Sequence, residues 1–289
     1  MVLEALIDPW SAKKHPFWLF VLGIIFSSFS ILFGLWVFKA QASLVMVFLT
    51  VVMTVPLMYA TLIAEEKEDL KTQNQTNILK EHSKAITFLT FLFLGFVVGY
   101  SLWYIFLPTS LLHTTFNVQL DTINAINTQA YALRGSVVVW NAGWKAFFSI
   151  LTNNFKVFLF CLVFAFFFGA GSIFILAWNA SVISAAVGTT FRNKLADYAT
   201  TLGFSKIAIY FQLFTISILR YMVHGIFEIV AYFLGGLAGG VISVALLKHG
   251  AGTEKFNTVV YDSLLLMIIA LFLLLLGSII EVFITPLLF

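Results

Sequence analysis

The stretch YMVHGIFEIVAYFLGGLAGG, residues 221–240, decides the fold class, because it is apolar enough to lie in a bilayer and still carries ionisable groups. Arg220 comes directly before it, and His224 and Glu228 follow at intervals of four residues. An ionised side chain in hydrocarbon is unfavourable unless it is paired, hydrogen-bonded or hydrated. We therefore expect these three groups to meet inside a bundle of membrane helices.

The composition of the whole chain indicates a polytopic membrane protein. Of its 289 residues 61% are hydrophobic and only 10% are charged, and the mean hydropathy is +1.01. The apolar runs have the length of helices and lack the alternation of barrel strands, so the predicted fold class is all-α, a polytopic helical bundle. The single cysteine, Cys161, excludes an internal disulfide. With a net charge of +3 and no basic stripe, nucleic-acid binding is not expected.

Six apolar runs are long enough to cross a bilayer. The shorter runs 180–190 and 207–223 are predicted as partial, re-entrant or interfacial helices, and the first run as a retained signal anchor. The six predicted spans are 17–38, 42–64, 85–107, 155–178, 225–247 and 259–284.

Three sections of the chain follow from these spans. Residues 1–84 hold two spans and a charged connector, residues 85–152 a third span and an outer loop, and residues 153–289 three spans with the partial helices. With six spans, Lys and Arg are more numerous on the side of the termini. We therefore expect a multi-pass protein of the cell membrane with both termini cytoplasmic; a span at 207–223 would move the C-terminus outside.

Two polar segments connect the spans. Residues 65–84 are interpreted as a cytoplasmic connector whose charges face solvent. Residues 108–144 form the long outer loop, in which Leu120, Ile123, Asn127 and Ala130 share one face of an amphipathic helix. This helix is expected to lie on the membrane or on a partner protein.

The ionisable groups in the membrane are expected to form one polar cluster of Arg220, His224, Glu228 and Glu281. A continuous helix would place the first three on one face. A break at His224–Gly225 would instead put Glu228 in the first turn of a new helix, where the helix dipole favours a carboxylate. We favour the break, because a glycine between two apolar runs is a stop signal.

Small residues indicate close helix packing at two places. One is the pair Gly169 and Gly171, and the other is the pair Gly235 and Gly239, which has small-xxx-small spacing. The same spacing allows a homo-oligomer without requiring one.

No motif indicates catalysis. The sequence lacks an HExxH metal signature, a nucleophile elbow, a Walker loop and a dinucleotide fingerprint. His224 and Glu228 could share a metal ion, but no third ligand lies near them in sequence. We expect no enzyme activity, no catalytic residue, no metal and no cofactor; an intramembrane hydrolase would need a nucleophile beside His224.

Three strings together resemble the stage II sporulation protein M family, also called the DUF95 integral membrane proteins. They are LTNNFKVFLF with GAGSIFILAWNASVISAAVG, then HGIFEIVAYFLGGLAGG, then LLGSIIEVFITP, and the likeness covers residues 116–286. Ala180 departs from the family pattern, which has glycine in an Asn-Gly turn there. The opening EALIDPWSAKKHPF is similar to the archaeal branch. The matching positions are Asn153, Asn154, Asn179, His224, Gly225, Glu228, Glu281 and Pro286.

The resemblance implies a non-enzymatic scaffold in an envelope-remodelling or membrane-remodelling assembly. In spore-forming bacteria the family member works beside peptidoglycan-degrading partners, so the expected partners are envelope proteins and membrane lipids. The alternative is a transporter or lipid-translocating protein that uses Arg220, His224, Glu228 and Glu281. Its basis is the pair of broken apolar runs, because discontinuous helices beside ionisable groups mark transporter sites.

Overall fold

A single long helix, α10 (Phe204–His249), forms the centre of the molecule. The computed structural model describes residues 16–70, 82–134, 140–197 and 204–288, and this part of the chain holds helices and no strand. The all-α prediction is therefore confirmed. The other helices are α3 (Pro16–Val37), η1 (Lys39–Gln41), α4 (Ala42–Asp69), α6 (Ser83–Phe106), α7 (Thr109–Arg134), α8 (Trp140–Phe164), α9 (Ala170–Asp197), α11 (Glu254–Ile279), the π-helical η3 (Ile280–Ile284) and α12 (Thr285–Leu288).

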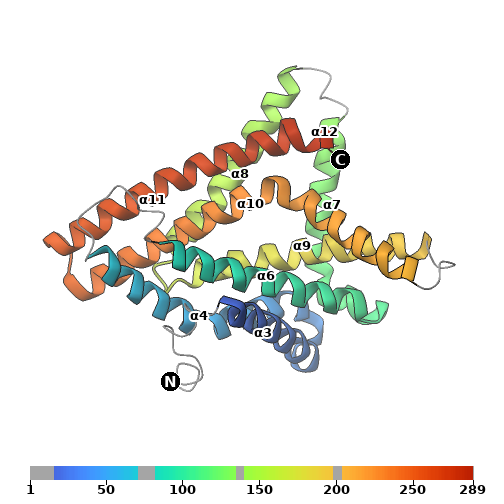
Figure 1. Cartoon of the computed structure of the whole chain (residues 1–289), viewed down its shortest axis with the longest axis horizontal. Coiled ribbons are helices and arrows are strands. Elements are labelled where there is room, and N and C mark those ends of the chain that lie inside the picture. The colour runs from blue at the N-terminus through green and yellow to red at the C-terminus, as the bar shows by residue number, and fades with distance from the viewer. Residues whose placement is uncertain (1–15, 71–81, 135–139, 198–203, 289) are drawn as a thin grey trace.

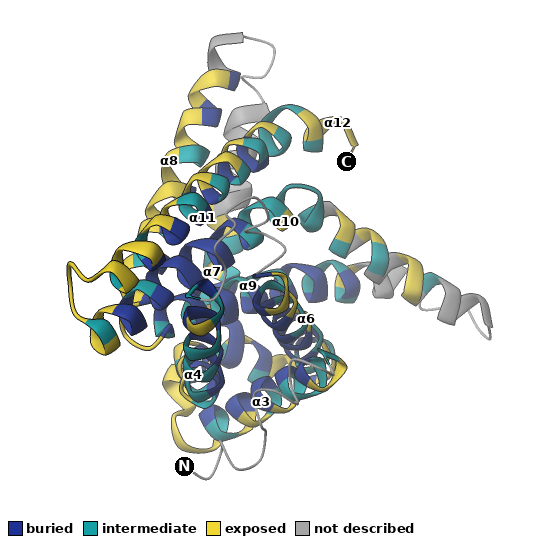
Figure 2. Cartoon of the chain, turned by 60° about the vertical axis from the view of Figure 1, so that its left-hand side comes forward, coloured by how far each residue is buried: buried dark blue, intermediate teal, exposed yellow. Residues whose placement is uncertain are grey.

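The helix α10 is continuous through 46 residues, so the expected break at His224–Gly225 is wrong. Both ribbon views show that α10 bends part-way along its length (Figures 1 and 2). Every residue from Ala231 to Val241 is buried, because α11, α9, α8 and α4 all pack around this part of α10. An isolated glycine such as Gly225 is tolerated in a helix when apolar neighbours on both sides keep the hydrogen-bond ladder intact.

Seven helices are long and apolar enough to cross a membrane: α3, α4, α6, α8, α9, α10 and α11. The predicted single span 155–178 is wrong, because α8 ends at Phe164 and α9 begins at Ala170. Gly169 turns the chain with a φ of +77°, a conformation that glycine adopts without strain. Sequence patterning missed this turn because its residues, FAFFFGAG, are as apolar as the helices beside them.

The turn between α8 and α9 satisfies its own backbone. The amide of Gly169 donates to the carbonyl of Ala165 at 2.8 Å, and the amide of Ala170 to that of Phe167 at 2.9 Å. A turn that pairs its polar groups internally needs no water, so it can lie at the depth of the hydrocarbon. If all seven helices cross, the two ends of the chain lie on opposite sides, which conflicts with two cytoplasmic termini.

Glycines bring helix backbones into direct contact. A Cβ on Gly23 would lie 2.6 Å from the carbonyl oxygen of Leu92, and a Cβ on Gly95 would collide with that of Phe20, so α3 and α6 touch. Gly235 and Gly239 face α8 in the same manner, against the ring of Phe158 and the backbone of α8. Gly171 packs against Phe164 across the α8–α9 turn. Without side chains at the crossings, dispersion contacts between backbones hold these helices together.

Hydroxyl groups add bonds between the helices of the amino-terminal half. The Thr50 Oγ1 on α4 lies 2.9 Å from Ser30 Oγ on α3 and 2.7 Å from the Tyr100 hydroxyl on α6. All three residues are fully buried. In an apolar bundle such bonds fix the register of helices that otherwise share only shape complementarity.

Part of the helix α7 packs on its own chain, whereas the expectation that residues 108–144 lie on the membrane or on a partner stays a prediction. Phe116 and Gln119 are fully buried between α7, α4 and α9. The Gln119 amide donates to the Ser43 carbonyl and to Ser181 Oγ, both at 3.2 Å. The predicted apolar face is partly used, since Leu120 and Ile123 pack on the core. The side chains of Asn127 and Ala130 lie outside the described residues.

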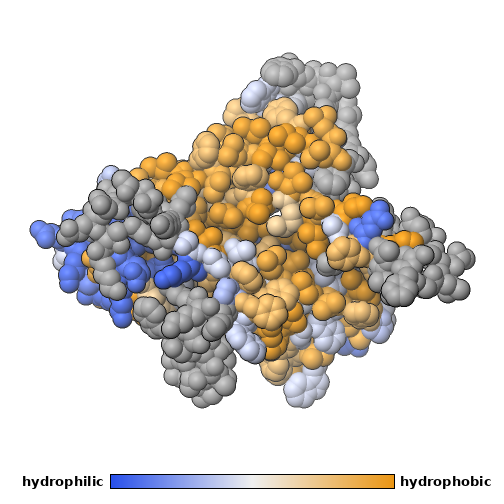
Figure 3. All heavy atoms as spheres, in the orientation of Figure 1, coloured by the Kyte–Doolittle hydropathy of each residue, from blue (hydrophilic) through white to orange (hydrophobic). Residues whose placement is uncertain are grey.

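The visible surface agrees with a membrane location. Hydrophobic residues cover most of the middle of the face in Figure 3, whereas hydrophilic residues gather at its left end, where α10 and α11 meet. Phe29, Phe48 and Phe272, on three different helices, are all more than half exposed. Large apolar side chains on an outer surface are expected where the solvent is lipid.

The glycine contact between α3 and α6 provides a stability test. Gly95→Ala should lower the free energy of unfolding by about 1–3 kcal/mol, because the new methyl group overlaps backbone atoms that cannot move alone. The control is Gly225→Ala, since a Cβ there meets nothing within 4 Å. Thermal unfolding of the purified protein in detergent measures both. Equal unfolding temperatures for the two variants would contradict the close crossing.

Candidate functional site

The polar cluster inside the bundle forms where α10 and α11 run antiparallel. A tight turn at residues 250–253 joins the two helices, so residues equally far from the turn lie beside each other. Glu228 consequently faces Gly277, whose missing side chain leaves it room: a Cβ there would lie 3.1 Å from Glu228 Cγ. One turn further along the chain, in η3, lies Glu281. The hairpin therefore brings the two carboxyl groups together.

Glu228 contacts both neighbouring elements. Its Oε1 accepts a hydrogen bond from the amide Nδ2 of Asn154 on α8, at 2.5 Å, and its carboxyl group lies close to that of Glu281. Asn154 is only 6% exposed, so its amide is shielded from water and donates its hydrogen bond to the Glu228 carboxyl group. The arrangement joins α8, α10 and the π-helical segment through one carboxyl group.

His224 lies next to this cluster but bonds elsewhere. His224 lies one turn before Glu228 on α10. Its Nδ1 is 3.3 Å from the hydroxyl of Thr285, the first residue of α12. The backbone of Arg220 belongs to α10, whereas its side chain lies outside the described residues, so its predicted place in the cluster stays a prediction.

A π-helical turn carries Glu281. The helical path continues through Pro286 as α12 after this wider turn. Proline removes one backbone donor and clashes with the carbonyl four residues before it. Directly before Pro286 the chain forms an i to i+5 turn, in which the backbone N–H of Thr285 donates to the carbonyl of Ile280. The Thr285 hydroxyl donates to the same carbonyl at 3.1 Å. Glu281 therefore lies in a turn of altered geometry next to a proline.

The remaining motif residues lie apart from the cluster. Asn153 is exposed on the outer side of α8, and Pro286 is exposed in α12. Asn179 donates to the carbonyl of Ile175 in its own helix at 2.9 Å. Asn179 and Ala180 lie within α9, so the turn that the family pattern predicts there is absent from this chain.

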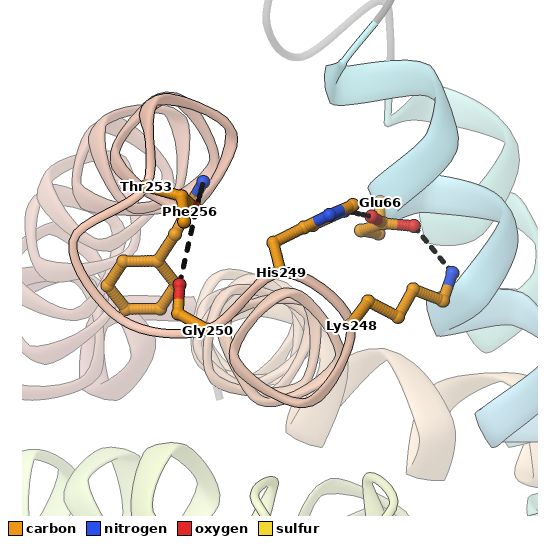
Figure 4. Close-up of polar contacts among 6 residues, drawn as sticks. All are labelled: Glu66, Lys248, His249, Gly250, Thr253 and Phe256. Atoms are coloured by element: carbon orange, nitrogen blue, oxygen red, sulfur yellow. Dashed lines mark hydrogen bonds and ion pairs between the residues drawn. The ribbon is translucent and has the colours of Figure 1, made fainter.

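A second cluster, which sequence analysis missed, closes the end of the bundle where α4 and α10 finish. Glu66 is 1% exposed and contacts two basic side chains of α10: Lys248 Nζ lies 2.7 Å from its Oε2 and His249 Nε2 lies 2.6 Å from its Oε1 (Figure 4). Figure 4 shows the Glu66 carboxylate between the two side chains. In the adjoining turn Thr253 caps α11 by accepting from the Phe256 amide.

The neighbouring acids of α4 bind the segment before α6. His82 is 1% exposed, with its Nδ1 2.9 Å from Glu65 Oε2 and its Nε2 3.3 Å from Asp69 Oδ1. The expectation that the charges of residues 65–84 all face solvent is therefore wrong for Glu65, Glu66, Asp69 and His82. The residues between 71 and 81 lie outside the described part.

A sequence signal for this cluster existed. Glu65 and Asp69 are four residues apart and so share one helix face, and Glu66 lies on the adjoining flank. Composition alone could not separate a solvated charge from a paired one, because pairing depends on where α10 ends.

Neither cluster has the make-up of a metal centre. Among the residues that the structure describes, no three His, Cys, Asp or Glu side chains are grouped closely enough to hold a metal ion. Cys161 is fully buried in the core. What the clusters do physically is bond helices to one another through groups that would be unfavourable alone in lipid.

The family model for stage II sporulation protein M matches residues 84–286, which is more than half of the chain. The chain belongs to the stage II sporulation protein M family. No curated protein and no solved structure matches the chain. The family region contains Asn154, Glu228 and Glu281, and it also contains both basic residues of the Glu66 cluster.

The amino-terminal helices of this stage II sporulation protein M family member lie outside the matched region. Among the contacts that attach them to it are the glycine crossing of α3 on α6 and the Glu66 cluster between α4 and α10. The second contact is ionic and the first apolar, so they can be tested separately.

Removal of the Glu66 carboxylate should destabilise this family member. Glu66→Gln should lower the free energy of unfolding by about 1–3 kcal/mol, because Lys248 and His249 lose a charged hydrogen-bond partner. Lys248→Met should have a smaller effect, since the Lys248 side chain is 34% exposed. The double variant should lose less than the sum of the two. Unfolding in detergent, with the exposed Lys255→Gln as control, measures these values; strict additivity would contradict the pairing.

Proposed function

We propose that this protein is a non-enzymatic structural component, a scaffold, of a membrane assembly that remodels the cell envelope. The observation that carries the proposal is the use of the ionisable groups: the described contacts of Glu66, His82 and Glu228 each join separate helical segments of the chain. Such groups hold a bundle in one arrangement, which is what a platform for other proteins needs. Family membership supports the same role.

The geometry of the interior favours a scaffold over a transporter. The basis for transport was a discontinuous helix, and α10 is continuous through all three positions 220, 224 and 228. A groove of about 500 Å³ lies between α8 and α11, lined by apolar residues and Thr152, and neither Glu228 nor Glu281 is part of its lining. Packed carboxyl groups with partners in the same chain support a structural role.

One observation favours the second candidate, a transporter or lipid-translocating protein. The π-helical turn that carries Glu281 in contact with Glu228 is a rare conformation, and π-helical turns occur frequently at functional sites. In that function the two carboxyl groups would bind the transported species or a coupled proton.

The amide–carboxyl contact separates the two functions. For a scaffold, Asn154→Leu should lower the unfolding free energy by about 1–3 kcal/mol, because Glu228 loses a buried donor. The neighbouring Asn153→Leu, on the exposed side of the same helix, is the matched control and should be neutral or stabilising. Thermal unfolding in detergent measures both variants.

A measurement of transport across vesicle membranes would contradict the scaffold function. Wild-type protein in sealed vesicles should show no movement of labelled phospholipid or protons above that of empty vesicles. Flux in the wild type that Glu228→Gln abolishes, with unchanged unfolding temperature, would replace the scaffold by the transporter.

We also propose an orientation in which the end holding Glu66 faces the cytoplasm. In the sequence, Lys13 and Lys14 come before α3, and Lys67, Lys71, Lys80 and Lys84 belong to the connector 65–84. This distribution of positive charge favours a cytoplasmic side for the start of α3 and the end of α4. The N-terminus is then cytoplasmic and the C-terminus external.

Labelling of introduced cysteines tests this orientation with little background, because Cys161 is fully buried. Lys39 and Lys255 are both exposed and lie at opposite ends of the bundle. Lys39 precedes α4, whereas Glu66 lies near the other end of α4. Lys248 and His249 contact Glu66, and Lys255 follows them across the short turn into α11. In intact cells a membrane-impermeant thiol reagent should modify Lys39→Cys and not Lys255→Cys. The reverse pattern would invert the orientation, and equal labelling would contradict the opposite placement.

A further inference from the structure

A polar stripe runs along the outer face of α8. It consists of Lys145, Ser149, Thr152 and Lys156, which recur at spacings of four, three and four residues and are all exposed. This periodicity places them in one row on a helix. The buried face of α8 lies on the opposite side and holds Phe147, Asn154, Phe158 and Cys161. The stripe therefore lies on the outward side of α8, with Thr152 at the edge of the groove between α8 and α11.

The stripe reaches the middle of the predicted membrane depth. The Trp144 ring packs on Phe283, with centroids 5.7 Å apart, and eleven residues further along α8 the Phe155 side chain lines the groove with Leu271 and Phe272 of α11. The candidate span containing α11 runs from Glu254 to Leu288, so Leu271 is at its centre. Lys156, next to Phe155, lies at about the same depth.

Lys156 has no partner within the described residues. None of the ion pairs or hydrogen bonds of the described part includes it, and its side chain is exposed. Extension of the Lys156 side chain along α8 toward the nearer membrane surface does not take its ammonium group out of the lipid. The helix ends there in the turn with Phe166, Phe167 and Phe168, all of which are exposed. A lysine in this place is unfavourable against lipid alone.

The span of α8 is also the least buried of the seven, at 22% of its central window. Along one side of the stripe α8 presents the large apolar side chains of Phe148, Phe155 and Leu159, each exposed. A row of polar groups beside a row of exposed apolar groups is the pattern of a helix that packs against another membrane helix.

We propose that this stripe is the docking face for a transmembrane helix of another protein that carries a carboxylate at mid-depth. Charge complementarity selects this occupant: two cations and two hydroxyl groups in a row require acceptors, and a carboxylate opposite Lys156 supplies the charge that the chain itself does not. The inference rests on the scaffold function and names the partner that the scaffold would hold.

Two other candidates for this face, a second copy of the chain and an anionic lipid, fit less well. A second copy related by a twofold axis along the membrane normal would place Lys156 against Lys156 at equal depth, which is repulsive. Anionic lipid headgroups lie at the membrane surface, far from the middle of α8. Lys145, near the end of the helix, is within their reach, whereas Lys156 is not.

A designed membrane peptide tests the proposal without knowledge of the natural partner. The probe is a leucine-rich transmembrane peptide with one central Glu, compared with peptides that carry Gln or Leu there. Energy transfer between labelled protein and labelled peptide in phosphatidylcholine vesicles reports association. Wild-type protein should bind the Glu peptide at least about tenfold more tightly than the Gln peptide, and Lys156→Met should abolish that preference. Lys255→Met, outside the stripe, should keep it.

Several outcomes overturn the proposal. One is equal binding of the Glu and Gln peptides by wild type; another is a preference that persists in Lys156→Met. Retention of phosphatidylglycerol that Lys156→Met abolishes, with no peptide preference, assigns the stripe to lipid. Energy transfer between two labelled copies that this substitution removes assigns it to self-association.

Separate control measurements distinguish a failure of the docking proposal from misfolding and from failure of the scaffold function. Lys156→Met should not lower the unfolding temperature, because it removes an exposed charge from an apolar surface. Lys156→Arg, which keeps the charge, should retain the preference for the Glu peptide, and its loss there would also count against the proposal. If the peptide preference fails while wild-type vesicles show no flux, only the docking face is wrong. Flux that depends on Glu228 overturns the scaffold itself, whatever the peptides do.

Discussion

The structure depends on one constraint: a polar or charged group in a hydrocarbon layer must find its partner within the protein. Glu228 illustrates it, because its carboxyl group is held by Asn154 of α8 and lies against Glu281 beyond α11. To make those contacts, α10 must lie between the two helices at a defined register. The buried run 231–241 then packs on four neighbours, and the glycines in it allow α8 to approach closely.

The same constraint explains how the amino-terminal helices are attached to the family region. Glu65, Glu66 and Asp69 are buried at the end of α4, and each contacts a basic side chain, that of His82 or those of the last two residues of α10. At the other side of the same helices, α3 meets α6 through glycines with no polar contact at all. One attachment responds to charge and the other to volume.

Against this background the polar stripe of α8 is an exception. The described ionic groups of the interior are matched inside the chain, whereas Lys156 lies on an outer surface where the chain offers no counter-charge. A protein that satisfies its own buried charges and leaves one row of polar groups facing outward is arranged to receive something. That contrast connects the interior network to the proposed role in an assembly.

The sequence by itself determined the helical class, the membrane location and the family, because composition, length of apolar runs and the HGIFE string are properties of residues in order. It also pointed to Glu228 and Glu281, since an acid in an apolar run is visible without coordinates. Helix boundaries were less accessible: the α8–α9 turn is apolar throughout, and the glycine after His224 is compatible with both a break and a continuous helix. Only the tertiary structure decided that α10 is unbroken, that Asn154 is the partner of Glu228, and that Glu66 is buried. These facts depend on which helix ends lie side by side, and neighbours in space that are far apart along the chain leave no local pattern to read.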